Sequence, residues 1–288
     1  MFRTRLLPQL IALNFLLASA CAPKAPPQAP ASGTPLAPSA TPSTSSAGSA
    51  TSGATPTIPA YIESVVAASD RSPEDRILDA QRKPGEVLAF FGIAPGMRVA
   101  ELAAGGGYTS ELLARTVGST GTFYGQNNKF ILERFAEKPW SERLAKPVMK
   151  GAIRLDSEFE APFPPDVKEL DAVLMVLFYH DTVWLKTDRA AMNRAIFSAL
   201  KPGGVYGIVD HSARPGDADT VAQTLHRIEE SLVVKEVEAA GFALEGRATF
   251  LQNPEDTRDW NDSPMAAGEK RGKSDRFVLK FVKPTHAH

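Results

Sequence analysis

The sequence predicts an α/β fold in which helices cover both faces of a doubly wound, mostly parallel sheet. Strand-like and helix-like segments alternate from residue 62 onward, which is typical of such sheets. Residues 171–179, "DAVLMVLFY", are almost wholly apolar, as expected of a strand that is buried on both faces. A glycine-rich turn, Gly105 to Gly107, follows a strand and precedes a helix, which is where these sheets bind ligands.

The elements follow from apolar runs and from the residues that interrupt them. Six segments are expected to be strands: residues 98–102, 121–126, 151–156, 171–179, 205–210 and 276–282. Five segments are expected to be helical: residues 73–91, 110–116, around 130–138, 188–200 and 220–240. The helix at 188–200 should end at "KPGG" and the helix at 220–240 at Gly241, because proline and glycine stop helices.

The first twenty residues have the succession of charged, apolar and small residues that is typical of a secretory signal peptide. Two arginines within residues 1–5 precede an apolar stretch at 6–17, and small residues follow in "LASAC". The apolar stretch is too short to span a bilayer comfortably, and Pro8 and Asn14 interrupt it. We therefore expect residues 1–20 to be a signal peptide.

Two kinds of processing fit this signal. Ala18 and Ala20 are the small residues that ordinary signal peptidase cleavage needs. The segment "LASAC" also resembles the lipobox of bacterial lipoproteins, in which the cysteine is acylated, although Ala18 stands where a lipobox usually has leucine. Cys21 is the only cysteine of the chain, so it cannot form an intramolecular disulfide. We expect an envelope protein whose lipid anchor at Cys21 attaches it to the membrane, with a soluble periplasmic protein as the alternative.

We expect residues 21–60 to form a disordered tether and residues 61–288 to form a single folded domain. The tether is composed almost entirely of Pro, Ala, Ser, Thr and Gly, with Lys24 as its only charged residue. Such a segment cannot bury enough apolar surface to offset its chain entropy. The net charge of −1 gives no reason to expect nucleic acid as a partner.

The glycine-rich turn predicts a nucleotide site, because glycines let the backbone approach a ligand and the next helix presents free N–H groups. Two kinds of nucleotide remain open. The dinucleotide fingerprint G-x-G-x-x-G is met only in part, by Gly105, Gly107 and Ser110. Glu101, near the end of the preceding strand, would repel a pyrophosphate but suits a ligand that carries a positive amino group.

On these residues the chain resembles the class I S-adenosylmethionine-dependent methyltransferases. Their first motif, an acidic residue followed by G-x-G-x-G, corresponds to "ELAAGGG". Glu101, Gly105 and Gly107 match it, while Ala103 replaces the first glycine, which is tolerable if Ala103 has a negative φ. The segment "IRLD" places Asp156 where the family contacts adenine.

The resemblance covers about residues 84–284. The segment "ALKPGGVYGIVDH" is similar to the family's approach to its fifth strand. Other segments, such as "RKPGEVLAFFGIAPGMRVAEL" and "SDRFVLKFVKP", look like a bacterial group known only as predicted methyltransferases. The resemblance implies a Rossmann-like methyltransferase fold whose last strand is antiparallel. It also implies S-adenosylmethionine as the cofactor and methyl transfer to a small or lipid-like acceptor as the reaction.

One position departs from the family pattern. The family usually ends its second strand with Asp or Glu, whose carboxylate accepts the ribose hydroxyls, whereas the corresponding residue here is Asn127, next to Gln126. Amide hydrogen bonds are weaker than those of a carboxylate. Two alternatives therefore stay open: a nucleoside-binding protein without turnover, and a dinucleotide-dependent oxidoreductase.

Candidate catalytic residues follow the fourth and fifth strands. Tyr179 is expected to line the adenosine site or the path of the methyl group. His180 could accept a proton from the acceptor, Asp181 could orient His180, and His211 is a second candidate base. These residues are equally compatible with ordinary loop positions.

The remaining polar residues are expected to be structural. His226 should lie in the middle of a helix, and Arg227, Glu229 and Glu230 should form a solvated helix face. The charged segment 253–275 is either a loop that shapes substrate access or plain surface. We expect no metal site, because one cysteine cannot build a cysteine-containing site and the histidines at positions 286 and 288 are too few.

The expected export of the domain is in conflict with the expected cofactor, which is made in the cytoplasm. S-adenosylmethionine is made in the cytoplasm, and nothing in the sequence shows how it would reach the envelope. Three resolutions remain open: the cofactor is supplied, the signal is inefficient, or the site has changed its ligand.

Overall fold

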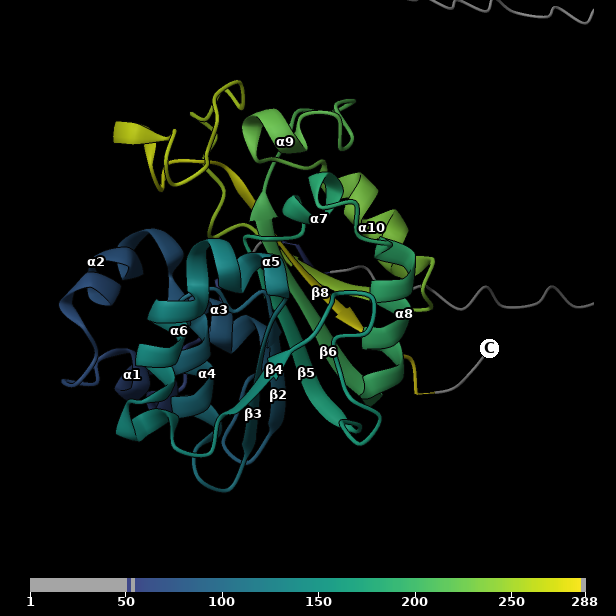
Figure 1. Cartoon of the computed structure of the whole chain (residues 1–288). Helices are drawn as coiled ribbons and strands as arrows, with labels where there is room; N and C mark the ends of the chain where they lie inside the picture. The colour runs from purple at the N-terminus through teal and green to yellow at the C-terminus, as the bar shows by residue number, and fades with distance from the viewer. Residues whose placement is uncertain (1–50, 53–54, 286–288) are drawn as a thin grey trace, which may run out of the picture. The chain divides into compact units, whose positions relative to one another are not determined.

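The computed structural model describes residues 51–52 and 55–285 (Figure 1), with side chains from residue 55 onward. The predicted signal peptide, Cys21 and most of the predicted tether lie outside the described residues. Within the described part, no helix has both the length and the apolar character needed to cross a membrane.

The described domain is built on one eight-stranded sheet with the order β1-β7-β8-β6-β5-β2-β3-β4. Only β8 runs antiparallel to its neighbours, β6 and β7. The prediction of a mostly parallel sheet with an antiparallel last strand is therefore confirmed. The strands are β1 (Thr51–Ser52), β2 (Arg98–Leu102), β3 (Thr122–Asn127), β4 (Ile153–Asp156), β5 (Leu170–Val176), β6 (Leu200–His211), β7 (Ala243–Ala248) and β8 (Arg276–Val282).

The strand order places the glycine turn at the switch point of the sheet. From β2 the chain moves outward through β3 to β4, then returns to the other side of β2 and continues from β5 to β6. The carboxyl ends of β2 and β5 therefore border a crevice, and the glycine turn begins directly after β2. This is the position that the sequence predicts for the ligand.

Helices cover both faces of the sheet (Figure 1). The longer helices are α1 (Ala60–Val66), α2 (Pro73–Arg82), α3 (Pro84–Phe91), α4 (Tyr108–Val117), α6 (Glu137–Leu144), α8 (Arg189–Ala199) and α10 (Glu230–Glu238). Helix α4 packs on β2 and β3, whereas α8 and α10 pack together near β6 and β7. The core lies between these layers, and Val173, Leu174 and Met175 of β5 have no exposed surface.

The predicted helix at 73–91 is wrong in one respect, because it is two helices. Helix α2 ends at Arg82, Lys83 takes a left-handed conformation with φ of 44°, and α3 begins at Pro84. A residue before proline is disfavoured in the right-handed helical region, so the break occurs where the sequence contains Pro84.

The predicted helix at 220–240 is also wrong. The structure has a short helix α9 (Ala222–Leu225), a left-handed residue at His226 with φ of 52°, and then α10. Between the two helices, Ile228 forms a parallel bridge with Ser212. Strand β7 follows α10 and was not predicted, because its short segment "ALEGRA" has few apolar residues.

Candidate functional site

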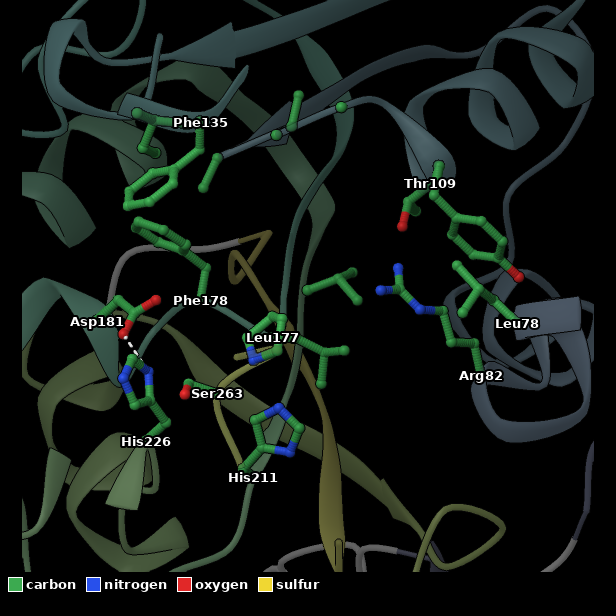
Figure 2. A pocket seen from close by; sticks show the side chains of 18 of the residues that line it. Leu78, Arg82, Thr109, Phe135, Leu177, Phe178, Asp181, His211, His226 and Ser263 are labelled. Carbon is green, nitrogen blue, oxygen red and sulfur yellow. Dashed lines mark ion pairs between the residues drawn. The ribbon is translucent and has the colours of Figure 1, made fainter. Parts of the chain in front are cut away.

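A cavity of about 700 Å³ opens at the carboxyl ends of the central strands. This volume is within the usual range for a small-molecule site. Figure 2 shows its two ends: Arg82 and Thr109 at one end, and Asp181, His211 and His226 at the other. Its lining also includes Glu101, Ala103, Gly105, Gly106, Gly107, Phe130, Phe135, His180, Trp184, Asp262 and Met265.

The glycine turn forms one wall of the cavity and needs its glycines. Gly105 and Gly107 have φ of 56° and 83°, in the left-handed region that glycine adopts most readily. A Cβ on Gly107 would lie 2.7 Å from the ring of Trp140, closer than real contacts allow. The turn therefore lies against Trp140 in a way that no other residue type permits.

Ala103 takes a left-handed conformation. Its φ is 55°, so the condition under which alanine would be tolerated here without strain, a negative φ, is not met. A left-handed alanine costs roughly 1–2 kcal/mol. The Ala103 N–H donates to Oε1 of Gln126 at 3.1 Å, which helps to hold this strained residue beside the cavity.

Asn127 holds the glycine turn and does not line the cavity. Its Oδ1 accepts from the Gly105 N–H at 2.8 Å, and its Nδ2 donates to the Gly105 carbonyl at 3.3 Å. Gln126 is also engaged, because its Nε2 donates to the Ser157 carbonyl. The predicted role of Asn127, hydrogen bonds to a ribose, is therefore corrected: both polar atoms of its amide bind Gly105.

Glu101 is a buried carboxyl group in the cavity wall. Its side chain is 3% exposed and accepts a hydrogen bond from the Ser110 hydroxyl. Burial raises the pKa of Glu101 to about 8, against the opposing effects of the Ser110 and Thr109 hydroxyls and of Arg82. A positively charged group in the cavity would favour the ionised form of Glu101.

Two predicted cofactor contacts lie elsewhere. Asp156, at the end of β4, is exposed, is paired with Arg154 at 2.7 Å and is not part of the cavity lining. Tyr179 is fully buried outside the lining, with its hydroxyl donating to Glu236 and accepting from Asn193. The role predicted for Tyr179 is therefore corrected, because its hydroxyl links the turn after β5 to α8 and α10.

The predicted catalytic residues of the fourth strand do line the cavity. The chain turns sharply after β5, at Leu177 with φ of 56°, and then presents His180 and Asp181. His180 is buried, and its Nδ1 lies 2.7 Å from Oδ1 of Asp210 at the end of β6. Burial alone would lower the pKa of His180, but the carboxylates of Asp210 and Asp181 outweigh it and raise this pKa to about 10.

His211 lies in the same wall, and its pKa is shifted in the opposite direction to that of His180. Burial lowers its pKa, although Asp262 lies 2.6 Å from its Nδ1. A base must be unprotonated before it accepts a proton, so His211 is better suited to this task near neutral pH than the protonated form of His180.

His226 was not predicted as a site residue, because the sequence around it resembles a continuous helix. The left-handed turn between α9 and α10 brings its Nδ1 to 3.3 Å from Nε2 of His180 and 3.0 Å from Oδ1 of Asp181. Within the described part of the chain, one group has the geometry to hold a metal ion: His180, Asp181 and His226. The sequence led us to expect no metal site, but the geometry of these three side chains is compatible with one.

The expectation of a solvated helix face is wrong for Arg227. Its side chain is fully buried, pairs with Asp256 at 2.7 Å and stacks over Trp260 with 4.6 Å to the ring centroid. Arg227 thereby fixes the segment 253–275, which carries Asp262 and Met265 into the cavity wall. This segment therefore shapes the cavity.

Comparison with known proteins shows the fold. No protein family model and no curated protein matches the chain. A solved S-adenosylmethionine-dependent methyltransferase from Aquifex aeolicus matches with a TM-score of 0.53 and 18% identity, over 77% of this chain and 98% of that one. The chain has the class I methyltransferase fold.

Two further solved structures match over similar lengths. A chain in the structure named "Complex between the Haloferax volcanii Trm112 methyltransferase activator and the putative methyltransferase" gives a TM-score of 0.52 at 18% identity, covering 81% of this chain and 100% of that one. The [4+2]-cyclase SpnF gives 0.51 at 17% identity, covering 72% and 82%. A protein named as a cyclase has the same fold, so the fold alone does not determine the reaction.

Proposed function

We propose that the chain binds S-adenosylmethionine in this cavity and transfers its methyl group to a small or lipid-like acceptor. The observation that carries the proposal is that an acidic and a basic side chain both line the cavity beside the glycine turn, at the switch point of a methyltransferase fold. Glu101 and Arg82 both line the cavity. Figure 2 shows Arg82, the last residue of α2, pointing into it.

These two groups suit the amino-acid part of the cofactor. The Arg82 guanidinium lies 4.5 Å from the ring centroid of Tyr108 and makes no ion pair with any residue between 55 and 285. It is therefore free to pair with a carboxylate, while Glu101 is placed to accept from an ammonium group. A pyrophosphate has no positively charged group that could pair with Glu101, which disfavours a dinucleotide.

The glycine turn completes the fit. Gly105, Gly106 and Gly107 line the cavity without side chains, and α4 begins directly after them. A ligand can therefore approach the backbone closely. When bound, the cofactor supplies a methyl group activated on a sulfonium, and the chain's task is to align an acceptor with it.

The opposite end of the cavity is where we place the acceptor. The side chains of Phe130 and Trp184 meet edge to face, and Phe135 and Met265 line the opening with 62% and 88% of their surface exposed. Exposed apolar groups at a cavity mouth favour an acceptor with an apolar part. His211, in the wall beyond them, is positioned to accept a proton from it.

Calorimetry of the purified chain with S-adenosylmethionine, S-adenosylhomocysteine and NAD tests the proposal. We expect binding of the first two at one site and no binding of NAD. Binding of NAD alone would contradict the proposal. Binding of the first two without methyl transfer to any acceptor would favour the alternative of a binding protein without turnover. Asn127 gives that alternative weight, since its amide is unavailable to a ribose.

We also propose that the chain belongs to the bacterial group that it resembles, and that it is anchored in the envelope through acylated Cys21. The support is the sequence order of charged, apolar and small residues before a single cysteine. Several acyl chains would anchor the protein firmly. Fractionation of cells that express the native chain or Cys21→Ser tests this: we expect only the native form in the membrane, and both forms in the cytoplasm would contradict it.

A further inference from the structure

Three potential metal-ligand atoms surround one space in the wall of the cavity. They are Nε2 of His180, Oδ1 of Asp181 and Nδ1 of His226. The distances between them are 3.1 Å from His180 to Asp181, 3.0 Å from Asp181 to His226 and 3.3 Å between the two histidines. Two histidines and a carboxylate are a frequent ligand set for divalent transition metals.

The tautomer of His180 follows from its other contact. Asp210 accepts from the backbone N–H groups of His180 and His211, so it acts as an acceptor, and its Oδ1 lies 2.7 Å from Nδ1 of His180. Nδ1 must therefore carry the proton. In the neutral ring, Nε2 then presents a lone pair toward Asp181 and His226.

A cation at this place would satisfy the lone pairs that these three atoms can present. A second proton on His180 would satisfy one or two contacts. A metal ion would satisfy all three, and the Asp210 carboxylate behind His180 is the partner that metal-binding histidines usually have. Oδ1 of Asp181 also accepts from the Trp184 indole N–H at 2.7 Å, which orients the carboxylate and leaves Oδ1 a second lone pair.

The size of the triangle fits a metal. Ligand atoms about 2.1 Å from a zinc ion are roughly 3.0–3.4 Å apart for angles between about 90° and 109°. The three distances here, 3.0, 3.1 and 3.3 Å, lie in that interval. The side chains therefore need little movement to become ligands.

We propose that His180, Asp181 and His226 form a site for a divalent transition metal, of the zinc type, with open positions toward the cavity. All three residues line the cavity, so the ion would be accessible to a ligand inside it. A hydroxyl or thiol of that ligand would fit such a position, and the ion would lower the pKa of this group. The metal site does not require the proposed cofactor, but together they would put an ion near the acceptor.

Titration of the tag-free full chain with Co²⁺ and Zn²⁺ tests the site. We expect one equivalent of Co²⁺ to give visible absorption bands and Zn²⁺ to displace it. Asp181→Asn and His226→Gly should each weaken the affinity for Co²⁺ by about 100-fold or more. Each removes a ligand, and even the loss of a residue that only contacts a ligand costs roughly 10- to 100-fold. Glycine suits the left-handed conformation of residue 226, so that variant should keep the fold.

Two controls make the result specific. His211→Ala removes a neighbouring histidine of the same cavity wall that is not one of the three ligands, and should weaken the affinity far less than the ligand variants do. The double variant His286→Ala/His288→Ala should keep one equivalent. Equal metal binding by the native chain and His226→Gly, or none by either, would overturn the site and leave a protonated His180 as the cation, without affecting calorimetry of S-adenosylmethionine.

Discussion

His180 Nδ1 and Asp210 Oδ1 lie 2.7 Å apart and join the ends of two neighbouring strands, β5 and β6. The Asp210 carboxylate has no exposed surface and also accepts from two backbone N–H groups, those of His180 and His211. One side chain thus holds both His180 and His211 in place at this end of the cavity.

Removing this carboxylate should destabilise the domain. Asp210→Ala leaves a buried imidazole and two buried N–H groups without their acceptor, so we expect the free energy of unfolding to fall by about 3 kcal/mol. Urea denaturation measures the change. Asp166→Ala, at an exposed position, is the control and should change the free energy by less than about 0.5 kcal/mol. Equal effects of the two variants would show that Asp210 does not hold the turns together.

Ala103→Gly should stabilise the protein. The substitution relieves a left-handed alanine, which outweighs the extra chain entropy of glycine, so we expect a gain of about 0.5–1 kcal/mol in the free energy of unfolding. Ala161→Gly is the matched control: Ala161 is exposed and is not among the residues with positive φ, and the same change there should cost about 0.5–1 kcal/mol. Opposite signs support the account, while a loss at both positions would contradict it.

Gly107→Ala should lower the free energy of unfolding by more than the left-handed backbone conformation of this residue alone explains. Gly92 has a similar φ, 71° against 83°, but a Cβ on it would meet nothing within 4 Å, whereas one on Gly107 would meet Trp140. We expect Gly92→Ala to cost about 1 kcal/mol and Gly107→Ala to cost about 1–3 kcal/mol more. Thermal and urea denaturation of both variants give the comparison, and equal costs would mean that the turn shifts away from Trp140 freely.

The stability of the domain should depend on the protonation of Glu101. Its folded pKa is raised by burial to about 8 from an ordinary 4.5, so the folded state holds a proton that the unfolded state loses between these pH values. The stabilisation is complete below pH 4.5 and falls by up to about 1.4 kcal/mol per pH unit as the pH rises toward 8.

Glu101→Gln should remove this component of the pH dependence. Urea denaturation from pH 4.5 to 9 should give a flatter profile for Glu101→Gln than for the native chain. Glu63→Gln, at an exposed position of α1, should leave the native profile unchanged. Parallel profiles for the native chain and Glu101→Gln would show that Glu101 is ionised in the folded protein throughout this range.

The sequence predicted the sheet well because its signals are local. Strands β2 and β8 begin and end where the apolar runs do, and the position of the glycine turn at the switch point followed from the alternation of strands and helices. The two helix breaks were harder to predict. Lys83 was signalled by the proline after it, but His226 has no such neighbour, and tertiary contacts hold its left-handed turn.

The site could be predicted only in part. Glu101, Gly105, Gly107, His180, Asp181 and His211 do line one cavity. A motif position does not reveal what a side chain contacts, which is why Asn127 and Tyr179 were assigned to a ligand that they do not face. Likewise, the grouping of His226 with His180 depends on a turn that joins residues 46 positions apart.

A crystal structure of the chain with S-adenosylhomocysteine tests the central claim most directly. We predict that the ligand lies along Gly105–Gly107, with its amino group within hydrogen-bonding distance of Glu101 and its carboxylate facing Arg82. A cavity that stays free of the ligand at saturating concentration, or a ligand bound elsewhere on the domain, would contradict the account.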